Sequence, residues 1–188
     1  DVAELILKDS GHLQEKDAEF LNRHKLSKHS PALPLYGVRD AEHALEHFST
    51  VDFHQSITIL DGLRFRFRRA GHILGAANVQ IDWGGKRIVF SGYIGRYNHP
   101  LMPDPASIEE TDYVVVESTY GNRLHDQGDP VEALGAITEK TVQRGGTLVI
   151  PSFAVGRAQE LLYYFWKLKQ AGRLSSVPIF LDSPMAID

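Results

Sequence analysis

The stretch that decides the fold runs from Tyr113 to Gly121 and has the sequence YVVVESTYG. Its first four residues are a continuous apolar run, which predicts a strand buried on both faces of a sheet. Glu117 follows at the carboxyl end of that strand, before a polar turn. Carboxyl ends of parallel strands line the ligand crevice of open α/β sheets, so this acid is a candidate site residue. The alternative is that the turn amides of residues 118–121 satisfy its carboxylate.

Beyond this stretch, helical and extended patterns alternate. Asp129-Pro130, with Glu132 in the first turn, predicts the start of a helix that ends at Gly145-Gly146. Strand–helix alternation of this kind predicts an α/β fold with a parallel, right-handed sheet. The further elements expected are a strand at 147–150, a helix at 156–172 and a strand at 177–181.

The part of the chain before the stretch has a different pattern. Residues 1–23 predict an amphipathic helix with Leu5, Leu13 and Phe20 on one face, and Asp40 predicts the cap of a short second helix. Two hairpins follow, turning at Asp61-Gly62 and at Gly84-Gly85. The expected strands are 57–60, 63–69, 78–82 and 86–90.

Three arginines alternate along the expected strand 63–69. Arg64, Arg66 and Arg68 point to one side of it, where they could contact the phosphates of a nucleic acid and make its binding depend on salt. We favour the simpler interpretation that they form a solvated strand face, which also protects against edge pairing.

Composition limits the possible functions. The 188 residues are 43% hydrophobic and 23% charged, with a net charge of −4, which argues against an overall polycationic nucleic-acid binder. There are nine His and no Cys, so any metal would be held by His, Asp or Glu. No stretch resembles a signal peptide or a membrane span, and we expect a cytoplasmic protein without a membrane partner.

Two further segments carry candidate site residues. His72 lies between Gly71 and Gly75 in AGHILGA (70–76), where glycines allow a sharp turn beside an imidazole; it is a candidate metal ligand or a turn residue without a role. In IPSFAVGRAQE (150–160) a strand leads into a helix start, where Ser152 and Arg157 are candidate phosphate contacts. The alternative for Arg157 is an ion pair with Glu160.

Taken together, these segments resemble one family. AGHILGA, FSG-x-IGR, VVESTYGNR, GGTLVIPSFAVGRAQELL and LDSPMAI occur in this order, as in the β-CASP branch of the metallo-β-lactamase superfamily, which processes RNA. The resemblance implies part of a metallo-β-lactamase αββα sandwich over 1–144, followed over 145–188 by the start of a parallel doubly wound β-CASP domain. It also implies a hydrolase of RNA phosphodiester bonds with two zinc ions.

The same resemblance assigns roles to residues. His72 matches a metal-binding His, Glu117 matches an acidic residue beside the metals, and Tyr93 stands where the family has an Asp that bridges both ions. The family's HxHxDH signature does not occur in this sequence, and neither do its later histidines. Two divalent ions ~3.5–4 Å apart need a shared anion, which a neutral phenol does not supply.

Because of these departures, we interpret the chain as an internal, incomplete piece of such an enzyme. We expect His72 as a residual ligand, Glu117 as acid–base or supporting residue, RNA as partner, and no measurable hydrolysis by this chain alone. A second copy of the chain or a related subunit is a further expected partner. The alternatives are a non-catalytic RNA-binding or scaffold subunit of the same family and a small-molecule hydrolase of the same superfold.

Overall fold

The computed structural model describes residues 2–187 and divides the chain into two compact units, 1–51 and 52–188. The domain boundary expected after residue 144 lies inside the second unit and stays a prediction. No helix within residues 2–187 is long and apolar enough to cross a membrane.

The first unit is a helical hairpin of α1 (Val2–His24) and α2 (Val38–Leu45). The two helices approach closely at a pair of glycines, because a Cβ on Gly11 would lie 2.8 Å from the carbonyl carbon of Gly37. The amphipathic helix is confirmed, but the prediction of which residues form its buried face is wrong in part. Leu13 and Phe20 are exposed, whereas the small residues Gly11 and Ala18 are buried.

The start of α2 also differs from the expectation in detail. The helix begins at Val38 with Gly37 as its N-cap, so Asp40 acts from the third helical position. There its carboxylate accepts the amide of Gly37 at 2.8 Å. Asp40 still stabilises the helix start, since it satisfies an amide that has no partner within the helix.

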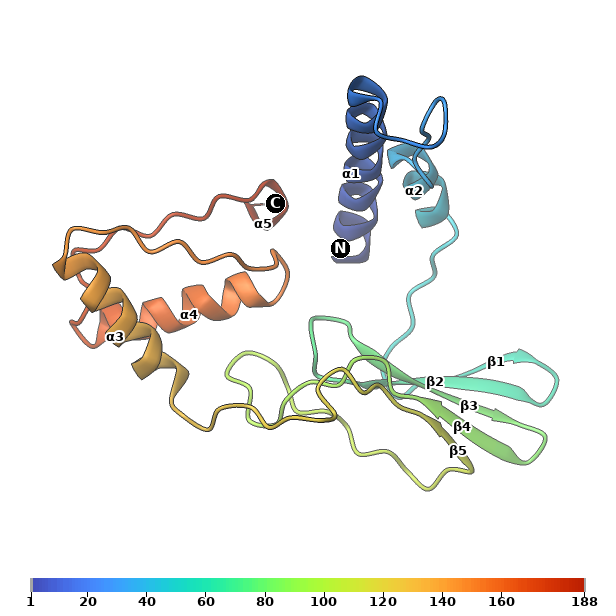
Figure 1. The fold of residues 1–188 in the computed structure, drawn as a ribbon. Coiled ribbons are helices and arrows are strands. Elements are labelled where there is room, and N and C mark those ends of the chain that lie inside the picture. The colour runs from blue at the N-terminus through green and yellow to red at the C-terminus, as the bar shows by residue number, and fades with distance from the viewer. Residues whose placement is uncertain (1, 188) are drawn as a thin grey trace. The chain divides into compact units, whose positions relative to one another are not determined.

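The second unit is built on a five-stranded sheet in the order β1-β2-β3-β4-β5 (Figure 1). The first four strands form antiparallel pairs, and β5 pairs with β4 in parallel. Both hairpins are confirmed, and the glycines at their turns have positive φ, of 73° at Gly62 and of 59° and 73° at Gly84 and Gly85. The strands are Ser56–Leu60, Leu63–Arg69, Ala77–Trp83, Lys86–Phe90 and Tyr113–Val115.

The apolar sequence around Tyr113 predicted a strand buried on both faces, and this prediction is wrong. β5 is the edge strand of the sheet, so only its β4 side is paired within residues 2–187. Its residues are about half exposed, from 50% at Val115 to 59% at Tyr113. Apolarity therefore indicated the strand correctly but not its surroundings.

After β5 come α3 (Pro130–Gln143), α4 (Arg157–Gln170) and the short α5 (Pro184–Ile187). The helix start at Asp129 is confirmed, because its carboxylate accepts the amides of Val131 and Glu132. A small core forms around Phe165, Leu168 and Leu174. The partly buried side chains packed against this core are Val131, Leu134, Ile150, Val177 and Ile179.

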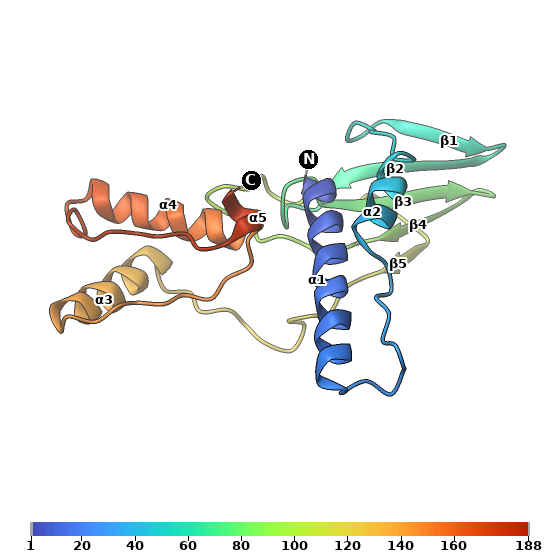
Figure 2. The same ribbon diagram turned by 90° about the horizontal axis from the view of Figure 1, so that it is seen from above.

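The two strands expected on either side of α4 are not formed. Residues 147–150 and 177–181 are assigned to no strand and have no ladder partner within residues 2–187. Ile150, Val177 and Ile179 pack inward, whereas Val149 and Phe180 are 81% and 87% exposed, so the alternation of a strand is present without its pairing. Figure 2 shows the segment after α4 running back along this helix toward α5. The only parallel pair in the described residues is β4–β5.

Candidate active site

The candidate site begins where β4 and β5 end. Because these strands are parallel, with Phe90 opposite Val115, the residues after them emerge at the same edge of the sheet. Ser91 joins the two ends: its amide donates to the Val115 carbonyl at 2.9 Å, and its Oγ accepts the Glu117 amide at 3.0 Å. Ser91 is 1% exposed, so this junction is a buried part of the fold.

The carboxylate of Glu117 is held by two backbone amides. Oε1 accepts the amide of Ile94 at 3.2 Å, and Oε2 accepts the amide of Thr119 at 3.0 Å. Hydrogen bonds from Thr119 and Ile94, together with the nearby His72, lower the pKa of the Glu117 carboxyl. Glu117 is therefore an anion at neutral pH, which can accept a proton or attract a cation but has no proton to give.

His72 is presented on a tightly folded loop after β2. Ala70 closes the loop by donating its amide to the Ala76 carbonyl at 2.9 Å, and its own carbonyl accepts the amide of Gly95 at 2.7 Å. Gly71 has a φ of 70°, and a Cβ on Gly95 would lie 1.9 Å from the Gly71 carbonyl oxygen. The loop thus needs glycine at both positions, and its imidazole remains exposed.

Tyr93 lies beside His72 on the segment that follows β4. Their ring centroids are 5.4 Å apart, with the planes inclined by 43°, and Tyr93 is 64% exposed. The structure therefore brings His72, Tyr93 and Glu117 to one edge of the sheet. Their individual roles as ligand, substituted ligand and acid–base residue stay predictions.

Ser152 and Arg157 lie at the start of α4. Ser152 is exposed in the extended segment before the helix, and Arg157 donates from Nη1 to Glu160 Oε2 at 2.5 Å, as in the alternative interpretation. The helix start lies near the His72 loop, because a Cβ on Gly156 would meet the Ile73 side chain at 3.1 Å. Phosphate binding by Ser152 and Arg157 stays a prediction. If Arg157 binds phosphate, its guanidinium would at the same time be paired with the Glu160 carboxylate.

Sequence reasoning missed a cluster around Glu160. This carboxylate accepts the hydroxyl of Tyr164 at 2.7 Å and lies 3.2 Å from Nε2 of His99. Burial and the Glu160 carboxylate raise the pKa of Tyr164 to about 12. The sequence contained a signal, because Glu160 stands one turn before Tyr164 and two turns before Leu168, on the same side of α4 as this apolar residue. An acid on a buried face needs partners.

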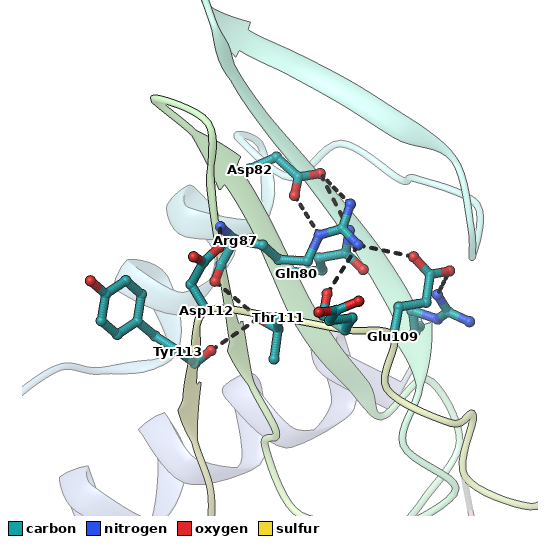
Figure 3. A network of polar contacts seen from close by, with 9 residues as sticks. Gln80, Asp82, Arg87, Glu109, Thr111, Asp112 and Tyr113 are labelled. Carbon is teal, nitrogen blue, oxygen red and sulfur yellow. Dashed lines mark hydrogen bonds and ion pairs between the residues drawn. The ribbon is translucent and has the colours of Figure 1, made fainter.

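A second polar network positions the segment that leads into β5 (Figure 3). Arg87 donates to Asp82 at 2.6 Å and to Glu109 at 3.1 Å, and Glu109 also pairs with Arg68. The amide of Arg87 donates to Asp112 at 2.9 Å. These contacts hold residues 109–112 against the sheet, so that β5 enters next to β4 in the register that places Glu117.

The same network shows that the strand face of Arg64, Arg66 and Arg68 is not the solvated face that we expected from the sequence. The side chain of Arg68 is only 16% exposed, because it pairs with Glu109. Arg66 is half-buried, and Arg64 is exposed. The face is thus partly covered and partly neutralised by carboxylates, which leaves Arg64 as the exposed cation of the three.

The donors at the site do not fit the zinc pair that the family resemblance implies. Within residues 2–187, no group of three or more His, Asp or Glu side chains is arranged to hold a metal ion. Glu117 already has both oxygens on backbone amides, and Tyr93 offers a phenol where a bridging carboxylate is needed. His72 remains as one nitrogen donor, whereas a zinc ion in a protein takes three or four ligands.

Comparison with known proteins gives relatives of one kind. A ribonuclease of Thermus thermophilus is 39% identical over 154 residues, which are 81% of this chain and 35% of the relative. An RNase J-like protein of Methanocaldococcus jannaschii is 33% identical over 154 residues, 80% of this chain and 37% of the relative. The cleavage and polyadenylation specificity factor 73 of Drosophila melanogaster is 36% identical over 167 residues, 86% of this chain and 24% of the relative. No protein-family model matches the chain.

The mixed sheet, the acid at the end of its parallel pair and these relatives define a class, the mixed α/β proteins of the metallo-β-lactamase superfamily. Within it, the chain belongs to the β-CASP family of nucleases. It spans no more than 37% of the length of the three relatives described above.

Proposed function

We propose that this chain is the part of an RNA-hydrolysing, zinc-dependent β-CASP enzyme that carries Glu117 and His72, and that it does not cleave RNA by itself. The observation that supports the proposal is the ionised Glu117 carboxylate, fixed by two amides beside His72 in a chain whose relatives are named ribonucleases. RNA as substrate, a second copy or related subunit as partner, and a cytoplasmic location belong to the same proposal.

The chemistry in this proposal is the hydrolysis of a phosphodiester bond. Water attacks phosphorus, the bond to the leaving oxygen breaks, and that oxygen takes up a proton. Glu117 suits the first half of this step, since an anionic carboxylate can accept a proton from the attacking water. The resting Glu117 carboxylate has no proton of its own for the second half at neutral pH, because its pKa is lowered, so the leaving oxygen takes the proton that Glu117 has accepted from the water or one from another donor.

The direct test uses the purified chain with labelled single-stranded RNA. We expect no cleavage with added zinc, because the described residues do not bring together the ligands of a zinc pair. Zinc-dependent cleavage that a chelator abolishes would contradict the proposal. A heat-treated sample and a Glu117→Gln chain serve as controls for a contaminating nuclease.

A chimera tests whether the chain is a segment of an active enzyme. The aligned 154 residues of the Thermus thermophilus ribonuclease are replaced by those of this chain, with either Tyr93 or Tyr93→Asp. We expect the Tyr93 chimera to be slower by at least roughly 100-fold, since supporting groups of a metal site alone are worth 10–100-fold. Equal activity of the two chimeras would show that the phenol does not impair the site.

The non-catalytic subunit is the second candidate, and Tyr93 at the bridging position is the observation that favours it. The same pair of chimeras separates the two functions. If Tyr93→Asp restores cleavage, the remainder of this segment is competent for catalysis. If the Tyr93→Asp chimera folds but stays inactive, other parts of the segment have also lost catalytic function, and a scaffold or RNA-binding role is favoured.

A further inference from the structure

Glu160 is an acid with three side-chain partners and little exposure. It is 8% exposed, and its Oε1 accepts the Tyr164 hydroxyl at 2.7 Å. Oε1 also lies 3.2 Å from His99 Nε2, while Oε2 accepts Nη1 of Arg157 at 2.5 Å. Tyr164 and Arg157 belong to α4, but His99 belongs to the loop between β4 and β5. One carboxylate thus joins this helix to that loop.

The contacts of His99 determine which ring nitrogen carries the proton. Its Nδ1 accepts the amides of Leu101 and Met102, both at 3.1 Å, so Nδ1 has no hydrogen. A neutral imidazole then carries its hydrogen on Nε2, which faces the Glu160 carboxylate. His99 therefore presents Nε2 to the Glu160 carboxylate at 3.2 Å on one side, and its Nδ1 orders its own turn on the other.

The loop that His99 anchors is the one that supports the site. Closer to β4, the amides of Ile94 and Gly95 donate to Glu117 and to the Ala70 carbonyl, at 3.2 and 2.7 Å. Farther along, Pro103 approaches the His72 loop, because a Cβ on Gly71 would lie 2.7 Å from its carbonyl oxygen. A displacement of this loop would move Tyr93 and the Ile94 amide together.

We propose that Glu160 is a positioning residue for this site: acting through His99, it anchors the loop of residues 93–103 to α4 and so holds the Ile94 amide on Glu117 and Tyr93 beside His72. This inference rests on the site of the proposed function but not on RNA cleavage. Its test measures the loop directly, so its failure is distinguishable from that of the proposed function.

A simpler role for Glu160 would be an ion pair with Arg157 that only stabilises the first turn of α4. Glutamine at position 160 separates the two roles, because its amide oxygen can still accept from Tyr164 and His99 although the charge is gone. Under our proposal Glu160→Gln preserves the loop and Glu160→Ala releases it. Under the ion-pair role both variants behave alike, and Arg157→Ala reproduces them.

The experiment is amide hydrogen exchange of the intact 188-residue chain, followed by NMR. We expect Glu160→Ala to speed exchange at Ile94, Gly95, Leu101 and Met102 by at least roughly tenfold. The loop can then open locally without first breaking the contact between His99 and Glu160. Glu160→Gln and Arg157→Ala should leave these rates near those of the unmodified chain. Glu139→Ala, which breaks the ion pair of α3 with Arg173 (2.7 Å), is the matched control and should also leave them unchanged.

A second variant keeps the test valid if Glu160→Ala disturbs α4 itself. His99→Ala removes the anchor from the loop side and leaves the bond between Tyr164 and Glu160, so it should speed exchange at Ile94 and Gly95 without affecting Leu168. Unchanged rates at Ile94 and Gly95 in His99→Ala would overturn the proposal. Nitrogen-15 shifts that place the His99 proton on Nδ1 would overturn it as well.

Discussion

The Glu117 carboxylate and the Ile94 amide are hydrogen-bonded at 3.2 Å, although 23 residues separate them in the chain. The bond links the end of β5 to the segment that follows β4, which carries Tyr93. Together with the Thr119 amide, it fixes the acid as an acceptor with a lowered pKa. The candidate site therefore depends on the loop after β4 as much as on the acid.

Stability should depend on pH through Glu117. The pKa of this carboxyl is lowered from 4.5 in the folded chain, so its stabilising effect is present above pH 4.5 and is lost as the pH falls through the folded-state pKa. We expect Glu117→Gln to unfold more easily than the unmodified chain at pH 7 and the difference to disappear in acid. Denaturant unfolding at several pH values measures this.

The control for that series is Glu110→Gln, which alters an exposed acid on the segment before β5. It should not produce the same pH-dependent difference. If Glu117→Gln is as destabilising at about pH 3 as at pH 7, its amide bonds do not depend on charge, and the account of the acid is wrong.

The small core around α4 should be sensitive to Leu168. This side chain is 1% exposed, and Leu168→Ala should lower the free energy of unfolding by about 2–5 kcal/mol through lost burial and a residual cavity. Leu162→Ala, on the same helix at 40% exposure, should cost less than about 1 kcal/mol. Similar losses from both would mean that Leu168 is not in a packed core.

The glycine contact beneath the His72 loop should not tolerate a methyl group. A Cβ on Gly95 would lie 1.9 Å from the backbone oxygen of Gly71, so Gly95→Ala should cost about 1–3 kcal/mol and displace the loop. Gly121→Ala is the control, because its new Cβ would approach the Ser118 carbonyl oxygen no closer than 3.4 Å. A Gly95→Ala chain with unchanged stability and an unchanged His72 spectrum would contradict this contact.

The phenol of Tyr164 should lose its proton at a higher pH than an ordinary tyrosine. Burial and Glu160 raise the pKa of its phenol to about 12 from 10.0, so its stabilising effect is complete below pH 10 and is lost as the pH rises through about 12. Ultraviolet titration of the unmodified chain minus that of Tyr164→Phe should show one phenol with a midpoint near 12. A midpoint near 10 would mean that Tyr164 lies open to solvent without its bond to Glu160.

The sequence was sufficient for the parts of the site that depend on local order. His72 and Glu117 could each be predicted to follow a strand. In the structure these strands are β2 and β5, and their ends lie at one edge because β2 and β4 both run antiparallel to β3 while β5 runs parallel to β4. The glycines around His72 also predicted the tight turn, because a positive φ depends on the local sequence.

Contacts between distant segments could not be predicted in this way. Periodicity does not tell that His99 would reach Glu160, or that Glu109 would cover Arg68, because neither pair shares an element. The strands expected at 147–150 and 177–181 failed for a related reason. Apolar residues do alternate in these segments, but a strand also needs a neighbouring strand to pair with. The sequence of one segment does not specify that neighbour.

Within residues 2–187 this chain brings together no ligand set for a zinc pair, and its metal content tests this most directly. The chain and Tyr93→Asp are incubated with excess zinc, passed through a desalting column and analysed for metal per chain. We predict less than about one zinc ion on the unmodified chain and more on Tyr93→Asp, since a carboxylate adds an anionic ligand. Two zinc ions retained by the unmodified chain would contradict the account.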